Sequence, residues 1–265
     1  MVKQEQIELV ATMREHLAGS LVAVDFDGTL APIVPDPADS RPAPGAIKAL
    51  SALSHAGAHV VIITGRDAAT VVRLGGLDAV PGLHVAGLYG LETWHDGYLV
   101  RPDEPESIRS LREQLPAVVR EHGMPGVRIE DKGLSLVVHT RRSTDPRGAL
   151  AMLRPPVAQL AQELGLEAKD GRNVIELRLA GLDKGGVLRG VIREVEPAAM
   201  LYAGDDLGDL PAFAVVAQAR AAGRAGWRVG VVSAEVPELA EHIDVAVKSP
   251  EELVTLLQQI AQVVS

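Results

Sequence analysis

Short apolar runs that stop abruptly at polar residues recur along this chain of 265 residues. Such runs cover residues 21–24, 59–63, 83–86 and 199–203, and segments with a helical spacing of apolar residues, such as 47–56, lie between them. Strands that alternate with helices are typical of a parallel sheet with helices on its faces. The pattern therefore predicts an α/β fold built on a Rossmann-like parallel sheet.

The alternating pattern is interrupted in the middle of the chain. Segments near 104–122 and 146–164 have helical patterns, and each is followed by two strand-like runs joined by a turn that contains Asp and Gly. Two copies of a helix plus a hairpin predict an α+β cap of four antiparallel strands. We therefore expect a discontinuous core domain, residues 1–101 and 182–265, with an inserted cap domain at residues 102–181.

The charge and composition of the chain exclude several classes of protein. The formal net charge is -9, whereas proteins that bind nucleic acids need a basic surface, so we expect no nucleic-acid partner. The absence of cysteine excludes disulfides, thiolate metal sites and cysteine nucleophiles. No segment has the roughly 20 consecutive apolar residues of a membrane span, and the N-terminal residues do not resemble a signal peptide. We expect a cytoplasmic protein without membrane partners.

Polar side chains follow several of the predicted strands at the point where each strand ends. Asp25 and Asp27 come directly after the first apolar run, in a loop that Gly28 makes flexible. The carboxyl ends of parallel strands meet at one edge of a sheet, and open α/β sheets bind ligands there. The residues expected to converge on one site are Asp25, Asp27, Thr64, Lys184, Asp205 and Asp206.

These residue types suit the transfer of a phosphoryl group, which needs metal charge, fixed donors and an in-line nucleophile. We expect Asp25 to attack phosphorus and to form an aspartyl phosphate, and Asp27 to act as general acid and then as general base. Thr64 and Lys184 would bind the phosphate as the other catalytic residues. The expected ligands of a Mg²⁺ ion are Asp25, Asp27, Asp205 and Asp206.

Two assignments remain open at this stage. Asp209 has the position of a helix-start residue, and for this residue alone that interpretation is favoured. The triplet Asp-Lys-Gly occurs twice, around Lys132 and around Lys184, so its composition cannot identify the functional lysine. The position of Lys184 beside the returning core strands favours Lys184.

Six segments of the chain carry a resemblance to a known family: DFDGTLAPIV, IITGR, GLYGLE, IEDKGLSLVVHTR, NVIELR and GDDLGDLPAF. With these segments, the chain resembles the trehalose-phosphatase family of the haloacid dehalogenase superfamily over nearly its full length. The resemblance implies a haloacid dehalogenase core with a cap, Mg²⁺ as the cofactor and hydrolysis of trehalose 6-phosphate in trehalose biosynthesis. It also implies a functional link to a trehalose-6-phosphate synthase.

The resemblance further implies a set of residues that bind the sugar phosphate. These residues are Gly65, Arg66, Glu130, Lys132, Arg141, Arg172, Glu176 and Arg178. Charged side chains of this kind can hydrogen-bond to sugar hydroxyls at fixed angles.

Three other functions are compatible with the same residues. A related capped phosphatase for sucrose phosphate, glycosylglycerate phosphate or a hexose phosphate would share the chemistry and differ in its cap contacts. A non-catalytic sensor of sugar phosphates would have no need to keep Asp25, Asp27, Lys184 and Asp205 together. A phosphomutase would pass the phosphoryl group to a second sugar hydroxyl and would need a bisphosphate activator.

Overall fold

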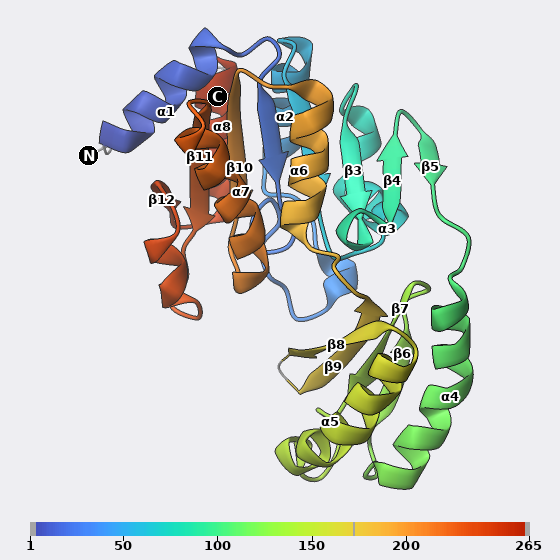
Figure 1. Cartoon of the computed structure of the whole chain (residues 1–265). Helices are drawn as coiled ribbons and strands as arrows, with labels where there is room; N and C mark the ends of the chain where they lie inside the picture. The colour runs from blue at the N-terminus through green and yellow to red at the C-terminus, as the bar shows by residue number, and fades with distance from the viewer. Residues whose placement is uncertain (1–3, 172, 263–265) are drawn as a thin grey trace. The chain divides into compact units, whose positions relative to one another are not determined.

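The computed structural model describes residues 4–171 and 173–262, and the chain divides into two compact units (Figure 1). The core unit comprises Met1–Arg101 and Asp183–Ser265, and the inserted unit comprises Pro102–Leu182. Each unit has its own sheet and its own cluster of buried apolar side chains.

The sheet of the core unit is mainly parallel. Its strands lie in the order β12-β11-β10-β1-β2-β3-β4-β5, with β4 and β5 antiparallel at one edge. The strand bounds are Leu21–Val24 (β1), His59–Ile63 (β2), His84–Gly87 (β3), Glu92–His95 (β4), Tyr98–Val100 (β5), Ala199–Gly204 (β10), Ala225–Val231 (β11) and Val245–Val247 (β12). The predicted α/β fold with a Rossmann-like parallel sheet is confirmed.

Helices cover both faces of this sheet (Figure 1). One face packs against α1 (Gln4–Glu15), α2 (Ala46–His55), α3 (Ala68–Gly75) and α8 (Pro250–Ala261). The other face packs against α6 (Lys184–Val195) and α7 (Leu210–Ala221). Short 3-10 helices lie at η1 (Pro37–Asp39), η2 (Leu77–Ala79), η3 (Leu88–Gly90), η4 (Leu207–Asp209) and η5 (Pro237–Glu241).

Strand β1 lies in the middle of the core unit because its side chains are apolar on both faces. Val22 and Val24 belong to the apolar cluster under α2 and α8, whereas Leu21 and Ala23 belong to the cluster under α6 and α7. Both clusters are shielded from water, and a strand buried on both faces is held firmly in its register. The residue that follows β1 therefore has a well-defined position.

The edge of the core sheet contains a hairpin with Asp96 and Gly97 in its turn. Both residues have a positive φ, +46° for Asp96 and +85° for Gly97. Two consecutive residues in this region form the tight turn that matches the twist of antiparallel strands. The hairpin joins β4 to β5.

The inserted unit is an antiparallel sheet with two helices. The strands lie in the order β6-β7-β9-β8, and every neighbouring pair is antiparallel. The bounds are Glu106–His122 (α4), Arg128–Asp131 (β6), Ser135–His139 (β7), Pro146–Glu163 (α5), Leu166–Gly171 (β8) and Val174–Leu179 (β9). The four antiparallel strands predicted from two helix-plus-hairpin segments are confirmed.

The two faces of the inserted sheet differ in polarity. Alternate positions along the strands face α4 and α5 and are apolar, including Leu136, Val138, Ile175 and Leu177. The intervening positions lie on the other face, which is called the polar face below. The polar face carries Arg128, Glu130, His139, Glu176 and Arg178.

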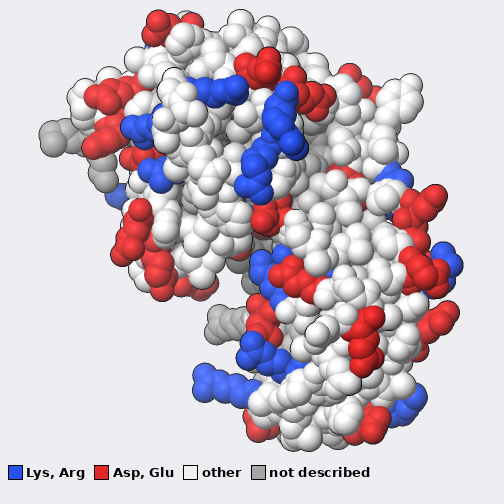
Figure 2. Space-filling model, viewed as in Figure 1, with Lys and Arg blue, Asp and Glu red and all other residues white. Residues whose placement is uncertain are grey.

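The surface of each unit mixes charges of both signs. On the face shown in Figure 2, acidic and basic side chains are interspersed over the visible part of each unit. Among the helices within residues 4–171 and 173–262, none combines the length and the apolar character needed to cross a bilayer.

Candidate active site

Three neighbouring strands of the core sheet end beside one another. Strand β1 pairs in parallel with β10 on one side and with β2 on the other. Asp25 follows β1, Thr64 follows β2 and Asp205 follows β10, so these residues lie at the carboxyl edge of adjacent strands. The sheet order thus brings together loops that are far apart in the sequence.

Asp25 lies at the end of β1 and is almost fully enclosed, with 4% of its surface exposed. Its backbone N–H donates to the carbonyl of Ala203 at 2.9 Å, which extends the pairing between β1 and β10. Lys184 Nζ lies 2.7 Å from Asp25 Oδ1, and Thr29 Oγ1 donates to Asp25 Oδ2 at 3.3 Å. Burial raises the pKa of Asp25 although Lys184 opposes this shift.

Lys184 is the first residue of α6 and is held in place by the helix start. The side chain of Asp183 caps the helix by accepting from the backbone N–H of Gly186 at 2.7 Å. Lys184 is buried, and burial opposes its charge, but Asp25 and Asp209 raise its pKa above the usual value. In contrast, Lys132 is exposed in the turn after β6. The structure therefore separates the two Asp-Lys-Gly triplets.

Asp209 is fully buried, and both of its carboxylate oxygens are occupied. Oδ1 accepts from Lys184 Nζ at 2.7 Å and from the hydroxyl of Tyr202 at 2.6 Å. Oδ2 accepts from the backbone N–H groups of Asp205 at 2.9 Å and Asp206 at 3.1 Å. Burial opposes the charge of Asp209, yet Lys184 and these donors keep its pKa below the usual value. The helix-start interpretation is correct, but it omits the ion pair with Lys184.

Tyr202 is a member of this network that the sequence analysis missed. It lies in β10, is fully buried and packs edge-on against Phe213 with ring centroids 5.5 Å apart. A tyrosine within a buried apolar run must find a partner for its hydroxyl, and this requirement was the available signal. Here the partner is Asp209.

The loop after β1 approaches the loop after β10 very closely. Thr29 Oγ1 donates to Asp205 Oδ1 at 2.9 Å. Gly28 has a φ of +81°, and a Cβ atom at this position would lie 2.0 Å from Asp205 Oδ2, so glycine is required. Burial, together with the charge of Asp209, raises the pKa of Asp205 to about 6.

A metal ion fits the charge of this cluster. Ligand atoms of Asp25, Asp205 and Asp209 lie within 4.8 Å of one another, and Lys184 is the cation that pairs with two of them. Each carboxylate oxygen of Asp209 already accepts two hydrogen bonds, whereas the oxygens of Asp25 and Asp205 have at most one partner each among the described residues. The carboxylates suited to hold an ion are therefore those of Asp25 and Asp205. Hard oxygen ligands of this kind suit a divalent cation such as Mg²⁺.

The other two predicted metal ligands have different surroundings. The side chain of Asp206 is a helix cap that accepts from the backbone N–H of Gly208 at 2.8 Å. The carboxylate of Asp27 accepts from Arg66 Nε and Nη2 at 2.5 Å each and from Ser40 Oγ at 3.1 Å. The structure therefore brings Asp25 and Asp205 together, and it does not place the side chains of Asp27 and Asp206 in the same cluster.

Arg66, predicted to bind substrate, bridges two loops of the core unit. Besides its pair with Asp27, its Nη1 donates to the carbonyl of Pro37 at 2.7 Å. Its backbone N–H donates to Thr64 Oγ1 at 3.1 Å, and Thr64 itself is buried. A Cβ atom on Gly65 would lie 2.8 Å from the hydroxyl of Tyr89, so the chain passes this side chain closely.

The predicted sugar-binding residues of the inserted unit lie on or beside its polar face. Glu130, Glu176 and Arg178 share this face, and Ser135 Oγ donates to Glu176 Oε1 at 3.1 Å. Lys132 lies in the turn after β6. Arg141 follows β7, and Arg172 lies outside the described residues.

Comparisons with known proteins identify the family. The family model of trehalose-phosphatases matches residues 23–251. The trehalose-phosphate phosphatase of Mycobacterium marinum is 38% identical over 205 residues, which are 74% of this chain and 51% of that protein. That of Mycobacterium tuberculosis is 36% identical over 76% of this chain and 54% of its own length. The chain thus spans about half the length of the curated relatives it matches.

Solved structures share the fold. A trehalose-6-phosphate phosphatase related protein is 26% identical, with a TM-score of 0.69, over 91% of this chain and 97% of its own. The trehalose-6-phosphate phosphatase of Aspergillus fumigatus is 22% identical, with a TM-score of 0.74, over 97% of both chains. A haloacid dehalogenase-like hydrolase from Bacteroides thetaiotaomicron has a TM-score of 0.60 at 15% identity, over 91% of this chain and 99% of its own. With the family model covering most of its length, this chain belongs to the trehalose-phosphatase family.

Proposed function

We propose that this chain is a magnesium-dependent phosphatase that hydrolyses trehalose 6-phosphate to trehalose and phosphate. The observation that carries the proposal is the buried ion pair of Asp25 with Lys184, which lies beside Asp205 at the end of the central strand β1. Family membership supports the choice of substrate. The reaction that supplies this substrate is the synthesis of trehalose 6-phosphate, which is the proposed functional link to a synthase.

In the first step, a carboxylate oxygen of Asp25 attacks phosphorus and the bond from phosphorus to the sugar oxygen breaks. The product is an aspartyl phosphate, which divides a slow hydrolysis into two easier steps. Lys184 and Thr64 stabilise the charge on the phosphoryl oxygens. Asp27 gives a proton to the departing sugar oxygen, so trehalose leaves as a neutral alcohol.

In the second step, a water molecule attacks the same phosphorus atom. Asp27 takes a proton from this water, and the bond between phosphorus and Asp25 breaks to release phosphate. Asp25 is then an ionised carboxylate again and Asp27 is again protonated. Since Arg66 holds both oxygens of Asp27, this pair must loosen whenever Asp27 exchanges a proton.

Asp25 and Asp205 are the side chains that would hold Mg²⁺, and the predicted roles of Asp27 and Asp206 belong to the same proposal. When bound, Mg²⁺ supplies positive charge that offsets the buried carboxylates and the phosphate. Among the described residues, Lys184 is the cation that pairs with Asp25 and Asp209, so the positive charge of Mg²⁺ would offset the remaining carboxylate charge of the cluster.

Substrate selection is assigned to the inserted unit, which we propose to be the cap domain. Its polar face offers carboxylates and guanidiniums, which hydrogen-bond to sugar hydroxyls. The proposed sugar-binding residues are Glu130, Lys132, Arg141, Arg172, Glu176 and Arg178, together with Gly65 and Arg66 of the core unit.

The test is the release of phosphate from a panel of trehalose, sucrose, glucose and glycosylglycerate phosphates, with magnesium or with a chelator. We expect a magnesium-dependent preference for trehalose 6-phosphate. Asp25→Asn should lower the rate by roughly a thousandfold or more, because the nucleophile is lost. Asp78→Asn is a matched control, since Asp78 is an exposed aspartate of the same unit.

Preference for another ester would leave the proposed phosphatase mechanism intact and would reject trehalose 6-phosphate as the preferred substrate. Absence of phosphate release from every ester would reject the phosphatase and leave a sugar-phosphate sensor. Equal rates in Asp25→Asn and the wild type would reject Asp25 as the nucleophile.

A further inference from the structure

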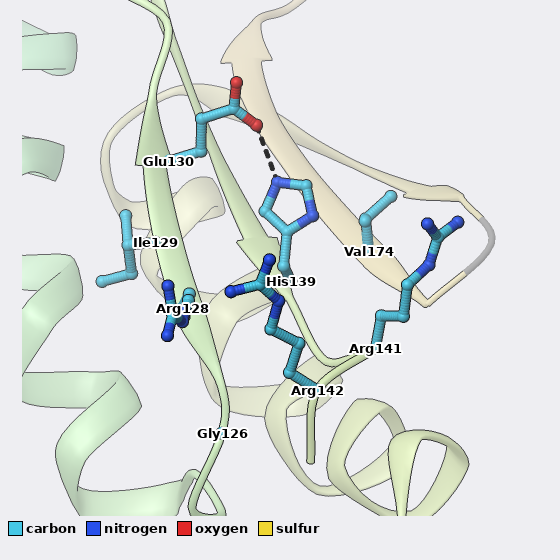
Figure 3. Close-up of a pocket in the computed structure, with 8 residues that line it drawn as sticks. All are labelled: Gly126, Arg128, Ile129, Glu130, His139, Arg141, Arg142 and Val174. Atoms are coloured by element: carbon cyan, nitrogen blue, oxygen red, sulfur yellow. Dashed lines mark hydrogen bonds and ion pairs between the residues drawn. The ribbon is translucent and has the colours of Figure 1, made fainter. Parts of the chain in front are cut away.

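The inserted unit contains a hollow of about 600 Å³ lined by three arginines (Figure 3). The arginines are Arg128, Arg141 and Arg142, and all three are exposed. Glu130 and His139 also line the hollow. A hollow of this volume matches the sites that hold small molecules in proteins. It is called the arginine hollow below.

The strand register brings these side chains together. Arg128 in β6 pairs with His139 in β7, and His139 pairs with Val174 in β9, so these residues stand in one row on the polar face. Arg141 and Arg142 follow β7 after Thr140 and line the same hollow from the chain segment beyond His139 (Figure 3). The arrangement depends on three strands of the inserted unit and on the segment that follows β7.

Within the described residues, the three guanidiniums have no carboxylate partner in this hollow. Among the residues of this unit that the structure describes, Glu130 supplies the one carboxylate that lines the hollow, and His139 Nε2 lies 2.7 Å from a carboxylate oxygen of Glu130. Elsewhere in the same unit, arginines do pair with acids: Arg112 with Asp131 at 2.5 Å, and Arg109 with Glu106 at 2.9 Å. The arginines that lack a carboxylate partner among the described residues are therefore the ones that line the hollow.

Three like charges around one hollow repel one another, and water screens this repulsion only in part. A bound oxyanion would attract all three guanidinium groups and so offset the repulsion between them. Guanidinium groups also present parallel N–H donors that match the oxygens of phosphate and carboxylate groups. This local excess of positive charge stands out in a chain with a net charge of -9.

We propose that the arginine hollow, which residues of the inserted unit form, is a binding site for the phosphate group of a small molecule. The ligand is a small anion, because the hollow measures about 600 Å³ and acidic side chains lie among the basic ones over the visible surface of the unit (Figure 2). The phosphate comes either from inorganic phosphate or from a sugar phosphate. Glu130 and Arg141 also belong to the proposed sugar-binding set, whereas Arg128 and Arg142 do not. The test therefore changes Arg128 and Arg142, and binding of phosphate by these two arginines does not depend on the proposed hydrolysis.

The experiment is calorimetric titration of the full chain with inorganic phosphate, in the presence of a chelator. The chelator removes divalent cations, and the carboxylate cluster around Asp25 then repels anions. We expect wild-type protein to bind phosphate and the double variant R128Q/R142Q to bind it at least about tenfold more weakly. Raising the salt concentration should weaken the binding, because the site is exposed.

The matched control is the double variant R120Q/R147Q. Arg120 in α4 and Arg147 in α5 are exposed arginines of the same unit, and neither lines the hollow. This variant changes the net charge by the same amount, so it should bind phosphate as the wild type does. Circular dichroism spectra that match the wild type would show that both variants are folded.

Parallel titrations with glucose 6-phosphate and with neutral trehalose identify the source of the phosphate. Binding of both phosphate and glucose 6-phosphate, lost in R128Q/R142Q, means that the hollow recognises the anion alone. Binding of glucose 6-phosphate alone means that the ligand is a sugar ester. Absence of binding to the wild type, or equal binding by the two double variants, would overturn the proposal.

Discussion

The core carboxylate cluster and the arginine hollow are built in opposite ways. In the cluster, Asp25, Lys184 and Asp209 are buried and bonded to one another, and Asp209 accepts four hydrogen bonds. In the hollow, Arg128 and Arg142 are exposed and face no free carboxylate among the described residues that line it.

The difference follows from access to water. A buried charge must be satisfied by the protein itself, because leaving it unpaired costs several kcal/mol. An exposed guanidinium is satisfied by water until a ligand replaces that water. The charged groups of the cluster therefore have their partners within the protein, whereas the arginines of the hollow obtain an anionic partner only when a ligand binds.

The largest effect is expected from Asp209→Asn. Asparagine has one acceptor oxygen, and its NH₂ group would face either the donors of Lys184 and Tyr202 or two backbone N–H groups. We expect unfolding to become easier by about 3 to 5 kcal/mol, measured by urea denaturation. A change below about 0.5 kcal/mol would show that the hydrogen bonds of Asp209 do not stabilise the fold. The contrast between the buried cluster and the exposed hollow would then be wrong.

A smaller effect is expected from Tyr202→Phe, which keeps the ring and removes one hydrogen bond to a charged carboxylate. The expected loss of stability is about 1.5 to 3 kcal/mol. Because Asp209 also holds Lys184, kcat for trehalose 6-phosphate should fall several-fold with little change in KM. An unchanged kcat in a destabilised variant would limit Tyr202 to a structural role.

The residues at the ends of strands were accessible to prediction from the sequence. Asp25, Thr64 and Asp205 follow apolar runs, and strands that alternate with helices place such ends at one edge. The hydrogen bonds of Asp209 were not accessible, because a tyrosine in a buried run contributes to the apolar pattern and its partner depends on how α6 and α7 pack.

The arginine hollow was not predictable for a different reason. Arg141 was carried over from the family motif, but Arg128 and Arg142 carry no sequence signal. Their gathering depends on the register that sets Arg128 opposite His139, and on the order in which β7 and β9 pair. A hydrophobic pattern shows which face a residue occupies, and it does not show which strand lies beside it.

Acid should lower the stability that an ion pair contributes more for the semi-buried pair of Asp244 with Arg228 in the core unit than for the exposed pair of Asp131 with Arg112 in the inserted unit. Asp244 has 12% of its side chain exposed and binds Arg228 at 2.7 Å. Burial opposes its charge, but Arg228 lowers the pKa of Asp244 below the usual value of 3.8. The pair therefore contributes its full stability above pH 3.8, and this contribution is lost as the pH falls further.

The measurement compares wild type with Asp244→Asn by thermal unfolding between pH 7 and pH 3. We expect the free energy of unfolding of the variant to be about 1 to 2 kcal/mol lower than that of wild type at pH 7. This difference should narrow below pH 3.8. Asp131→Asn is the control: Arg112 lowers the pKa of Asp131, but Asp131 is 43% exposed, so solvent screens the pair and the difference should be smaller. A difference that does not change with pH would contradict the assignment to Asp244.

The smallest effect is expected from R128Q/R142Q in the absence of phosphate. Since these arginines have no carboxylate partner in the hollow, their replacement should change the free energy of unfolding by less than about 0.5 kcal/mol. The change should favour the folded state, because repulsion is removed. Added phosphate should then raise the melting temperature of wild type more than that of the variant, since a ligand stabilises the state that binds it. A loss above about 1 kcal/mol without phosphate would mean that the arginines stabilise the fold as the buried cluster does.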